Sequence, residues 1–187
     1  MAGRRSSLMR SAVLVIDMIE DFVNGRLGFE NAKKIVPNIA GLLETARTKG
    51  VPVIYVCDSH LPGDPEISLW GEHAMAGSPG SKVIRELCPR PGDFMVEKST
   101  YSAFYGTNLD CLLKRLNVDR VILTGVTTDI CVLHTAADAF FRGYRIVTVS
   151  DCTAAFDEGT HRRALETMRR LYGAEIKTSS EVVGEGI

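Results

Sequence analysis

The stretch RVILTGVTTDICVLHTAADAFFRG, residues 120–143, decides the fold because it joins two elements of different kinds. Residues 120–126 are a β-branched apolar run, which is typical of a buried strand. Residues 129–143 are an apolar run of helical length that ends in glycine. A buried strand followed closely by a helix is the repeating unit of a parallel α/β sheet. The polar residues between the two, with Cys131 among them, raise the question of chemistry at this junction.

The same alternation runs outward in both directions along the chain. Because the strand-like runs are apolar on both faces, helices must cover both sides of the sheet they form. The sequence therefore predicts an α/β fold with one domain over residues 11–187, after a flexible N-terminal arm at residues 1–10. The other expected strands are 12–17, 51–58, 93–98, 144–151 and a weaker 174–178, and the other expected helices are 31–50, 81–87, 107–117 and 158–173.

Composition excludes several classes of protein. With 187 residues, 45% hydrophobic content and a formal net charge of -1, the chain is expected to be one compact soluble domain without an affinity for nucleic acid or anionic membranes. No apolar run approaches the roughly 20 residues that span a bilayer, and the basic start lacks a signal-peptide cleavage pattern. The five cysteines are odd in number and form no CxxC pair, which indicates a reducing, cytoplasmic setting.

Charged and nucleophilic residues follow the predicted strands. In an open parallel sheet the carboxyl ends of the strands share one edge, where ligands bind. Charged groups are expensive to bury without a purpose, so a charged edge above an apolar sheet indicates a chemical site. The residues expected on this edge are Asp17, Asp58, His60, Lys98, residues 127–131 and Asp151.

Cys131 is expected in the first turn of its helix, with Thr127, Thr128 or Asp129 as the N-cap. The positive end of the helix dipole, helped by Lys98, is expected to lower the thiol pKa from about 8.5 toward the ~3.5–7.5 range of reactive cysteines. The same backbone N–H groups could hold an oxyanion. The alternative is that Cys131 is an inert filler, as we expect for the four other cysteines.

Two charged residues are expected to assist Cys131. Asp17 directly follows its strand and is expected to take the thiol proton and later return it to a leaving amine. The ordinary alternatives are a turn cap for Asp17 and a solvated loop for Lys98. Asp21 is a weaker acid candidate because it lies beyond the strand.

The pair Asp58 and His60 is followed by Glu66 and His73. Two imidazoles and carboxylates suit a divalent transition metal such as zinc, iron or manganese, with positions open for water or substrate. An ordinary surface loop is the alternative. His134 shares a helix face with Cys131, but a structural role is expected for it, and His161 lies on a polar helix and is expected on the surface.

Three ordered motifs, VLVIDMIEDF (13–22), EKSTYSAFYGTNL (97–109) and GVTTDICVLHTAADAF (125–140), resemble the isochorismatase-like cysteine hydrolases, within them the nicotinamidase and N-carbamoylsarcosine amidase relatives. The resemblance covers residues 11–178. It implies a six-stranded, mostly parallel sheet with helices on both faces, a three-layer α/β/α arrangement, and often a dimer or tetramer. It also implies an Asp17–Lys98–Cys131 triad, a cis peptide between Val126 and Thr127, and an oxyanion hole made by the Thr127 and Cys131 amides.

Within this family the chain resembles nicotinamidases in carrying the pair Asp58 and His60 and the later His73. The resemblance implies a divalent metal, zinc first and iron or manganese as alternatives, held by Asp58, His60, Glu66 and His73, and binding the pyridine nitrogen of nicotinamide. Trp70 is expected to wall the ring, with Phe22 and Tyr101 as partners. Two departures from the family pattern, Ile19 and Ser59, leave the substrate open.

The sequence thus predicts a cysteine-dependent amidohydrolase with a small-molecule amide substrate. Hydrolysis of nicotinamide to nicotinate and ammonia through a thioester is the first hypothesis. A related amidase for a carbamoyl or ureido group is the second. An isochorismatase is disfavoured by Asp58, His60 and His73, and a non-enzymatic α/β binding module by the absence of a GxGxxG or GxxxxGK[ST] motif after any strand.

Overall fold

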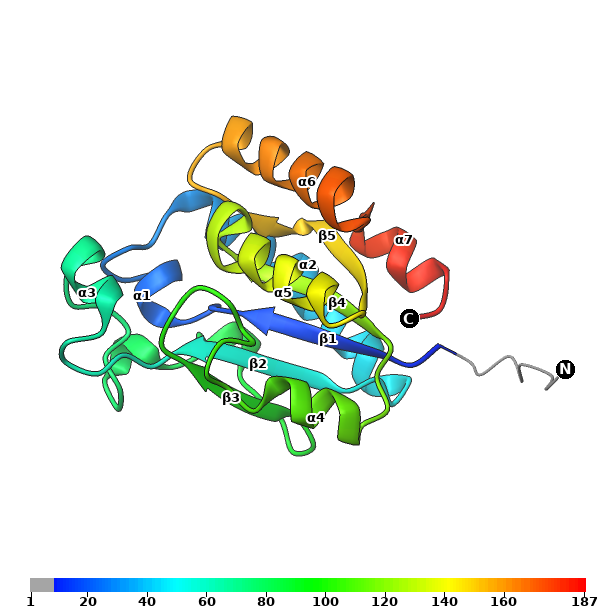
Figure 1. The fold of residues 1–187 in the computed structure, drawn as a ribbon, viewed down its shortest axis with the longest axis horizontal. Coiled ribbons are helices and arrows are strands. Elements are labelled where there is room, and N and C mark those ends of the chain that lie inside the picture. Colours follow the sequence, from blue (N-terminus) through cyan, green and yellow to red (C-terminus); the bar gives the residue numbers. More distant parts are fainter. Residues whose placement is uncertain (1–8) are drawn as a thin grey trace, which may run out of the picture.

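The six strands of the part of the chain that the structure describes form one parallel sheet in the order β3-β2-β1-β4-β5-β6 (Figure 1). The structure is a computed structural model that describes residues 9–187, so the predicted flexible arm at residues 1–10 lies outside the described residues except for its last two. Every strand pair is parallel, which confirms the predicted α/β sheet. The strands are β1 (Ser11–Ile16), β2 (Val53–Asp58), β3 (Phe94–Lys98), β4 (Arg120–Val126), β5 (Arg145–Ala154) and β6 (Glu175–Lys177).

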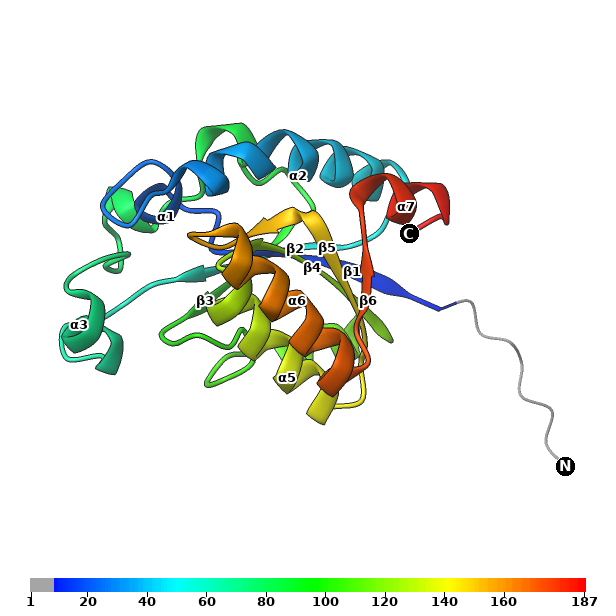
Figure 2. The same ribbon diagram turned by 90° about the horizontal axis from the view of Figure 1, so that it is seen from above.

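Helices cover both faces of the sheet, as Figure 2 shows. On one side lie α2 (Glu30–Thr48) and α7 (Ser179–Gly184), and on the other α5 (Leu133–Phe141) and α6 (Glu158–Tyr172). Successive side chains of β1 point to opposite faces: Val13 and Val15 belong to the core beneath α2, whereas Leu14 and Ile16 belong to the second core, which also holds residues of α4 (Leu109–Arg115). The predicted three-layer arrangement is confirmed.

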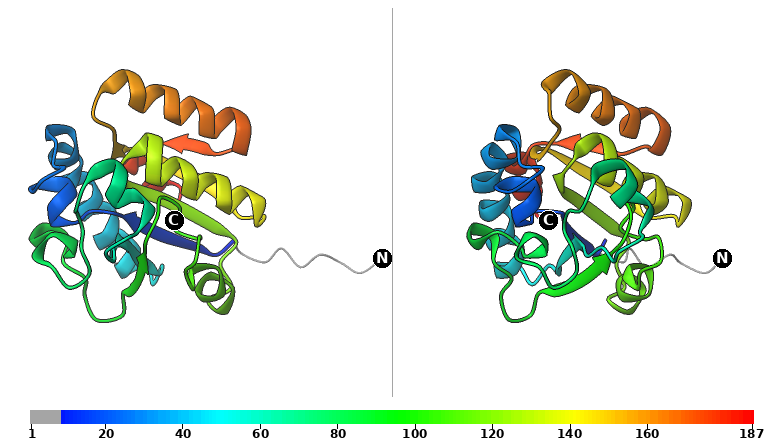
Figure 3. Two further views of the ribbon diagram at one scale, coloured as in Figure 1. Left: turned by 60° about the vertical axis from the view of Figure 1, so that its left-hand side comes forward. Right: turned by 90° about the vertical axis from the view of Figure 1, so that its left-hand side faces the viewer.

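The strand order reverses between β1 and β4, and this is where such a sheet binds ligands. At the end of this strand pair, Gly125 has a φ of +105°, and a Cβ atom there would collide with the carbonyl of Ile16. Only glycine lets β4 approach β1 this closely. The right-hand view of Figure 3 looks onto the end of the molecule that holds the carboxyl edge of the sheet.

Several predicted elements differ from the observed ones. Residues 81–87 are not one helix but parts of two short 3-10 turns, η1 (Pro79–Ser81) and η2 (Arg85–Leu87). The short helices α1 (Glu20–Val23) and α3 (Pro65–Trp70) have too few turns for their periodicity to be recognised in the sequence. Of the helices in the described residues, none is both long and apolar enough to cross a bilayer.

Strand β5 continues to Ala154, beyond its predicted end at residue 151. Asp151 therefore lies inside the strand, and its carboxylate accepts hydrogen bonds from the backbone N–H and the hydroxyl of Ser179, both at 2.7 Å. The expected place of Asp151 at the binding edge is wrong: this carboxylate instead holds the first turn of α7.

Candidate active site

Three of the predicted catalytic side chains meet at the carboxyl edge of the sheet. Asp17 follows β1, Lys98 ends β3, and Cys131 lies in the turn after β4, and all three are buried. The Lys98 Nζ atom lies 2.8 Å from Asp17 Oδ2 and 3.7 Å from Cys131 Sγ. A carboxylate oxygen of Asp17 and the Cys131 sulfur are within 4.8 Å of each other. The structure thus brings a carboxyl group, an ammonium group and a thiol together.

Asp58 also belongs to this cluster, which sequence reasoning did not predict. Strands β2 and β3 pair Asp58 directly with Lys98, and the Lys98 Nζ atom lies 2.5 Å from Asp58 Oδ1. The backbone N–H of Asp58 donates to Asp17 Oδ1 at 2.8 Å. Lys98 therefore contacts two buried carboxyl groups at once, and the Lys98 ammonium and the Asp58 backbone N–H together fix Asp17.

Burial and mutual charge shift the pKa values in this cluster. Burial and the negative charge of Asp58 raise the pKa of Asp17 to about 7, against the opposing effect of Lys98. Burial lowers the pKa of Lys98, but the attraction of Asp17 and Asp58 outweighs it and raises this pKa well above the usual range. Asp17 is therefore suited to exchange a proton near neutral pH.

The pKa of the Cys131 thiol is raised, not lowered. Burial is the largest cause, Lys98 opposes it, and the charges of Asp17 and Asp58 add to it. The lowered pKa predicted from the helix terminus and Lys98 is wrong for this set of residues, because the sulfur is buried beside two carboxylates. The resting thiol keeps its proton until a neighbouring base removes it.

The turn that carries Cys131 has an uncommon backbone conformation. The peptide between Val126 and Thr127 is cis, and the first helical turn after β4 is a π turn, η3 (Thr128–Val132). The N–H groups of Ile130 and Val132 both donate to the Thr127 carbonyl, at 3.2 and 3.1 Å. The Cys131 N–H, between them in the sequence, does not share this acceptor. Thr127 is the N-cap residue, but its side chain makes no capping hydrogen bond.

His161 supports this turn from α6. It is buried, and its Nδ1 atom lies 2.8 Å from the hydroxyl of Thr128. The expected surface position is wrong, because the face of α6 that carries His161 also carries Ala164, Leu165 and Met168 and packs against the protein. A spacing of three, four and seven residues between these positions was the signal available in the sequence.

His161 is predicted to make the protein sensitive to acid. Burial lowers its pKa below the ordinary 6.5, and the nearby Glu158 and Asp129 oppose this only partly. A lowered folded-state pKa gives stability that is present above the unfolded pKa and is lost as the pH falls through the folded pKa. We expect the free energy of unfolding to fall less between pH 7.5 and 5.5 in His161→Gln than in wild type. Urea titrations at both pH values measure this. His134→Gln, at an exposed position, is the control, and equal slopes in all three proteins would contradict the prediction.

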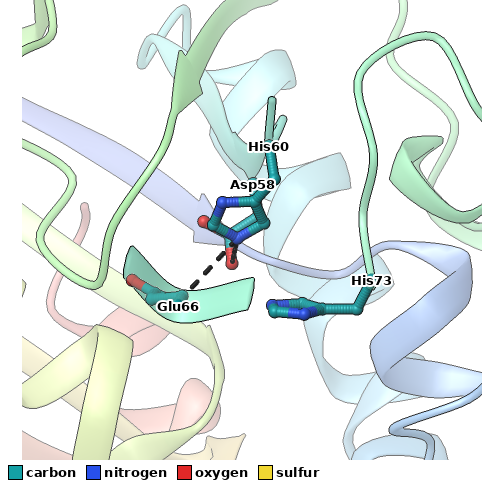
Figure 4. Close-up of side chains that lie close together, drawn as sticks. All are labelled: Asp58, His60, Glu66 and His73. Carbon is teal, nitrogen blue, oxygen red and sulfur yellow. Dashed lines mark ion pairs between the residues drawn. The ribbon is translucent and has the colours of Figure 1, made fainter. Parts of the chain in front are cut away.

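The four predicted metal ligands converge, as Figure 4 shows, and one of them, Asp58, also belongs to the cluster around Cys131. Asp58 ends β2, Glu66 lies on α3, and His60 and His73 lie in the segments on either side of α3; all four are buried. One ligand atom of each lies within 4.8 Å of those of the others. The His60 Nε2 atom is 3.6 Å from Asp58 Oδ2 and 3.8 Å from Glu66 Oε2.

The surroundings of both histidines aim their Nε2 atoms at this cluster. Nδ1 of His60 donates to the Asp64 carboxylate at 3.3 Å, and Nδ1 of His73 donates to the Gly71 carbonyl at 2.6 Å. Partners of this kind commonly orient metal-binding imidazoles. Within the described chain, three buried atoms of the cluster have no hydrogen-bond partner: His60 Nε2, Asp58 Oδ2 and Glu66 Oε1. A divalent cation such as zinc would satisfy them, so the residues fit the metal that the sequence predicts.

A pocket opens between the metal ligands and Cys131. Its walls are mostly aromatic and aliphatic, and two of the lining side chains are joined, because Trp70 Nε1 donates to the Tyr101 hydroxyl at 3.1 Å. No lysine or arginine is among the residues of the described chain that line it. The predicted Phe22, Trp70 and Tyr101 all lie there, and Leu27, Ile130 and Phe156 were missed by the sequence analysis.

His134 takes no part in this pocket. It is exposed, and its Nδ1 atom donates to the carbonyl of Ile130 at 2.7 Å, within its own helix. It is therefore not the base of a Cys–His pair, in agreement with the structural role expected for it.

Comparison with known proteins places this site in a family. The model of the isochorismatase domain matches residues 11–181. Nicotinamidase 3 of Arabidopsis thaliana is 35% identical over 161 residues, which cover 83% of this chain and 78% of the relative. The crystal structure of N-carbamoylsarcosine amidase from Thermoplasma acidophilum superposes with a TM-score of 0.88 at 47% identity, over 93% of this chain and 99% of that one.

A pyrazinamidase of Pyrococcus horikoshii, solved in complex with zinc, superposes with a TM-score of 0.84 at 26% identity, over 90% of this chain and 99% of that one. The domain match spans nearly all of the described residues, and it includes the turn of Cys131 and both charged partners of the thiol. The chain therefore belongs to the isochorismatase family of hydrolases.

Proposed function

We propose that this protein is a cysteine-dependent amidohydrolase that converts nicotinamide and water to nicotinate and ammonia. One observation carries the proposal: a single pocket with aromatic walls is lined both by Cys131 and by Asp58, Glu66 and His73 of the four-residue metal cluster. The relatives named nicotinamidase and pyrazinamidase support it.

In the proposed reaction Asp17 first takes the proton of the Cys131 thiol. The sulfur then attacks the amide carbonyl, and the N–H groups of Thr127 and Cys131 hold the oxyanion that forms. When the C–N bond breaks, Asp17 returns the proton to the departing ammonia and a thioester remains. Asp17 then removes a proton from water, whose oxygen attacks the thioester carbonyl. When the C–S bond breaks, Asp17 returns this proton to the Cys131 sulfur, so that nicotinate is released as the acid and the thiol is restored. The pKa of Asp17, about 7, suits both directions of transfer.

Lys98 keeps Asp17 in place throughout this cycle. Its ammonium contacts the carboxylates of Asp17 and Asp58 and also the Cys131 sulfur, so it stabilises whichever of these groups is negative. Because one cation faces all three groups, negative charge can move between sulfur and carboxylate without a change of counterion.

Asp58, His60, Glu66 and His73 would hold the divalent metal, zinc by preference. When bound, such an ion supplies a Lewis acid for the ring nitrogen of an aromatic amide. Asp58 links the metal site to catalysis, because one of its oxygens contacts Lys98 and the other faces His60.

The walls of the pocket favour nicotinamide over acidic substrates. N-carbamoylsarcosine, ureidoacrylate and isochorismate all carry a carboxylate, which needs a cationic partner when it leaves water. No arginine or lysine of the described residues lines the pocket, and Lys98 beneath it is already paired with two carboxylates. A neutral aromatic amide needs no such partner. A carbamoyl amide remains the second candidate, because the similarity to an N-carbamoylsarcosine amidase reaches 47% identity.

Ammonia release tests this proposal directly. Zinc-loaded protein is expected to turn over nicotinamide at least tenfold faster than N-carbamoylsarcosine, as kcat/KM. A strong chelator should abolish the nicotinamide activity, and added zinc should restore it. Turnover of the carbamoyl compound alone would transfer the assignment to the second candidate. Activity that survives complete metal removal would contradict the role of the cluster.

We also propose that the protein works in the cytoplasm as a homo-oligomer. All five cysteines are free thiols, which suits a reducing compartment. Phe140, Phe141 and Tyr172 form an aromatic cluster at the ends of α5 and α6 in which both phenylalanines are exposed, and a second copy of the chain would cover it. A monomer by light scattering under reducing conditions would exclude the oligomer.

A further inference from the structure

Asp21 lies apart from the catalytic cluster and serves another part of the site. It was the weaker acid candidate in the sequence, and it lies on α1, one turn beyond the strand that positions Asp17. Its Oδ2 atom accepts a hydrogen bond from the backbone N–H of Ala74 at 2.7 Å. Gly80 packs directly against this carboxylate, and a Cβ atom there would collide with it. The protein thus closely surrounds a carboxylate that the reaction does not use.

Ala74 connects the two histidines of the metal cluster. It directly follows His73, is fully buried, and has a φ of +44°, which is uncommon for a residue with a side chain. Its carbonyl accepts the backbone N–H of His60 at 3.0 Å, and the His60 carbonyl accepts the N–H of Ala76 at 2.9 Å. The backbone of one histidine is therefore bonded to the residue next to the other.

The hydrogen bond from Asp21 thus fixes both histidines through one residue. The N–H of Ala74 is held by Asp21, and its carbonyl holds His60. The neighbour of Asp21 acts in the same sense, because the ring of Phe22 packs edge-on against that of His73 with 5.6 Å between centroids. Helix α1 therefore contacts the His73 segment at two points: Asp21 holds the backbone at Ala74, and Phe22 packs against the imidazole of His73.

We propose that Asp21 is a positioning residue of the metal site: its carboxylate holds Ala74 and thereby sets the separation of His60 and His73. The assignment rests on the metal cluster of the proposed function, but not on the identity of the substrate. Without this hydrogen bond the His73 segment keeps its backbone bonds to His60 but loses its tie to α1, and the four ligand atoms are held less firmly in place before the metal binds. Outer partners of metal ligands typically contribute about 10–100-fold to affinity.

The test is the affinity of the metal-free full-length protein for zinc, measured by competition with a chromophoric chelator. Asp21→Ala is expected to bind zinc about 10–100-fold more weakly than wild type. Asp21→Asn keeps an oxygen that accepts the Ala74 N–H, and its affinity should stay close to wild type. Gly80→Ala leaves Asp21 in the chain but displaces its carboxylate, so it should weaken binding in the same direction as Asp21→Ala.

Glu20→Ala is the matched control. It removes an acid from the neighbouring position of α1. Among the described residues this side chain accepts a hydrogen bond only from Asn24, at 3.0 Å, so Glu20→Ala should bind zinc like wild type. The absorption spectrum of bound cobalt should change in Asp21→Ala and not in Glu20→Ala, which a general loss of stability would not produce.

The possible outcomes distinguish the positioning role, the metal site and the proposed substrate. Equal zinc affinity in Asp21→Ala and wild type would overturn the positioning role. A wild type that binds no zinc would overturn the metal site and this role together. A wild type that binds zinc tightly without hydrolysing nicotinamide would overturn the proposed substrate only, and the comparison of the Asp21 variants would still decide the positioning role.

Discussion

Replacing Cys131 with alanine is expected to lower kcat/KM for nicotinamide by at least about 10⁴-fold, the scale on which hydrolases lose activity without their nucleophile. No thioester forms without the sulfur, and no other thiol of the described chain lines the pocket. The substitution removes only the Sγ atom and leaves Asp17 and Lys98 paired, so the fold should persist. Ammonia release measures the activity, and circular dichroism checks the fold.

Cys152→Ala is the matched control for this experiment. Cys152 is a fully buried thiol on β5, and burial raises its pKa as it does for Cys131, but it does not line the pocket. Its loss should leave kcat/KM within about twofold of wild type, as expected for a small change at a distant site. Turnover by Cys131→Ala within tenfold of wild type would refute covalent catalysis by this residue, whatever the substrate.

Replacing Lys98 with methionine is expected to lower the free energy of unfolding by about 3–5 kcal/mol, the range found when one member of a buried ion pair is removed. The methionine has nearly the same length but no charge. In wild type the carboxylates of Asp17 and Asp58 lie 2.8 and 2.5 Å from the Lys98 ammonium. In the variant both stay buried next to each other without a cation. Catalysis should also be lost, since Asp17 is no longer fixed next to Cys131. Urea denaturation of the metal-free protein at pH 7.5 measures the stability.

Lys114→Met controls for the loss of a lysine as such. Lys114 is also paired with an aspartate, at 2.6 Å from Asp110, but its side chain is 69% exposed. Exposed pairs of this kind contribute roughly 0–1 kcal/mol, so this variant should stay within that range. Equal losses in the two variants would show that the Lys98 cluster is not held together by its buried charges.

Local sequence pattern predicted the frame of the molecule well. β-Branched runs alternate with helix-length runs, and this alternation led to the parallel sheet and to the edge on which Asp17, Lys98 and Cys131 meet. The prediction failed where an element has fewer than two turns, as at residues 81–87, and where a strand runs past a charged residue, as at Asp151. A short element has no period to read, and the hydropathy of one residue does not show where a strand stops pairing.

For β1 to β4 the sequence by itself determined which residues end or follow the strand, and the parallel fold then places these residues on one edge. Only the tertiary structure decided their relations. The register of β2 and β3 brings Asp58 onto Lys98, burial beside two carboxylates raises the pKa of Cys131, and the packing of α6 buries His161 against Thr128. Each of these joins residues at least 33 positions apart in the chain. Periodicity is a local property, whereas charge, burial and hydrogen bonding depend on neighbours that only the folded chain supplies.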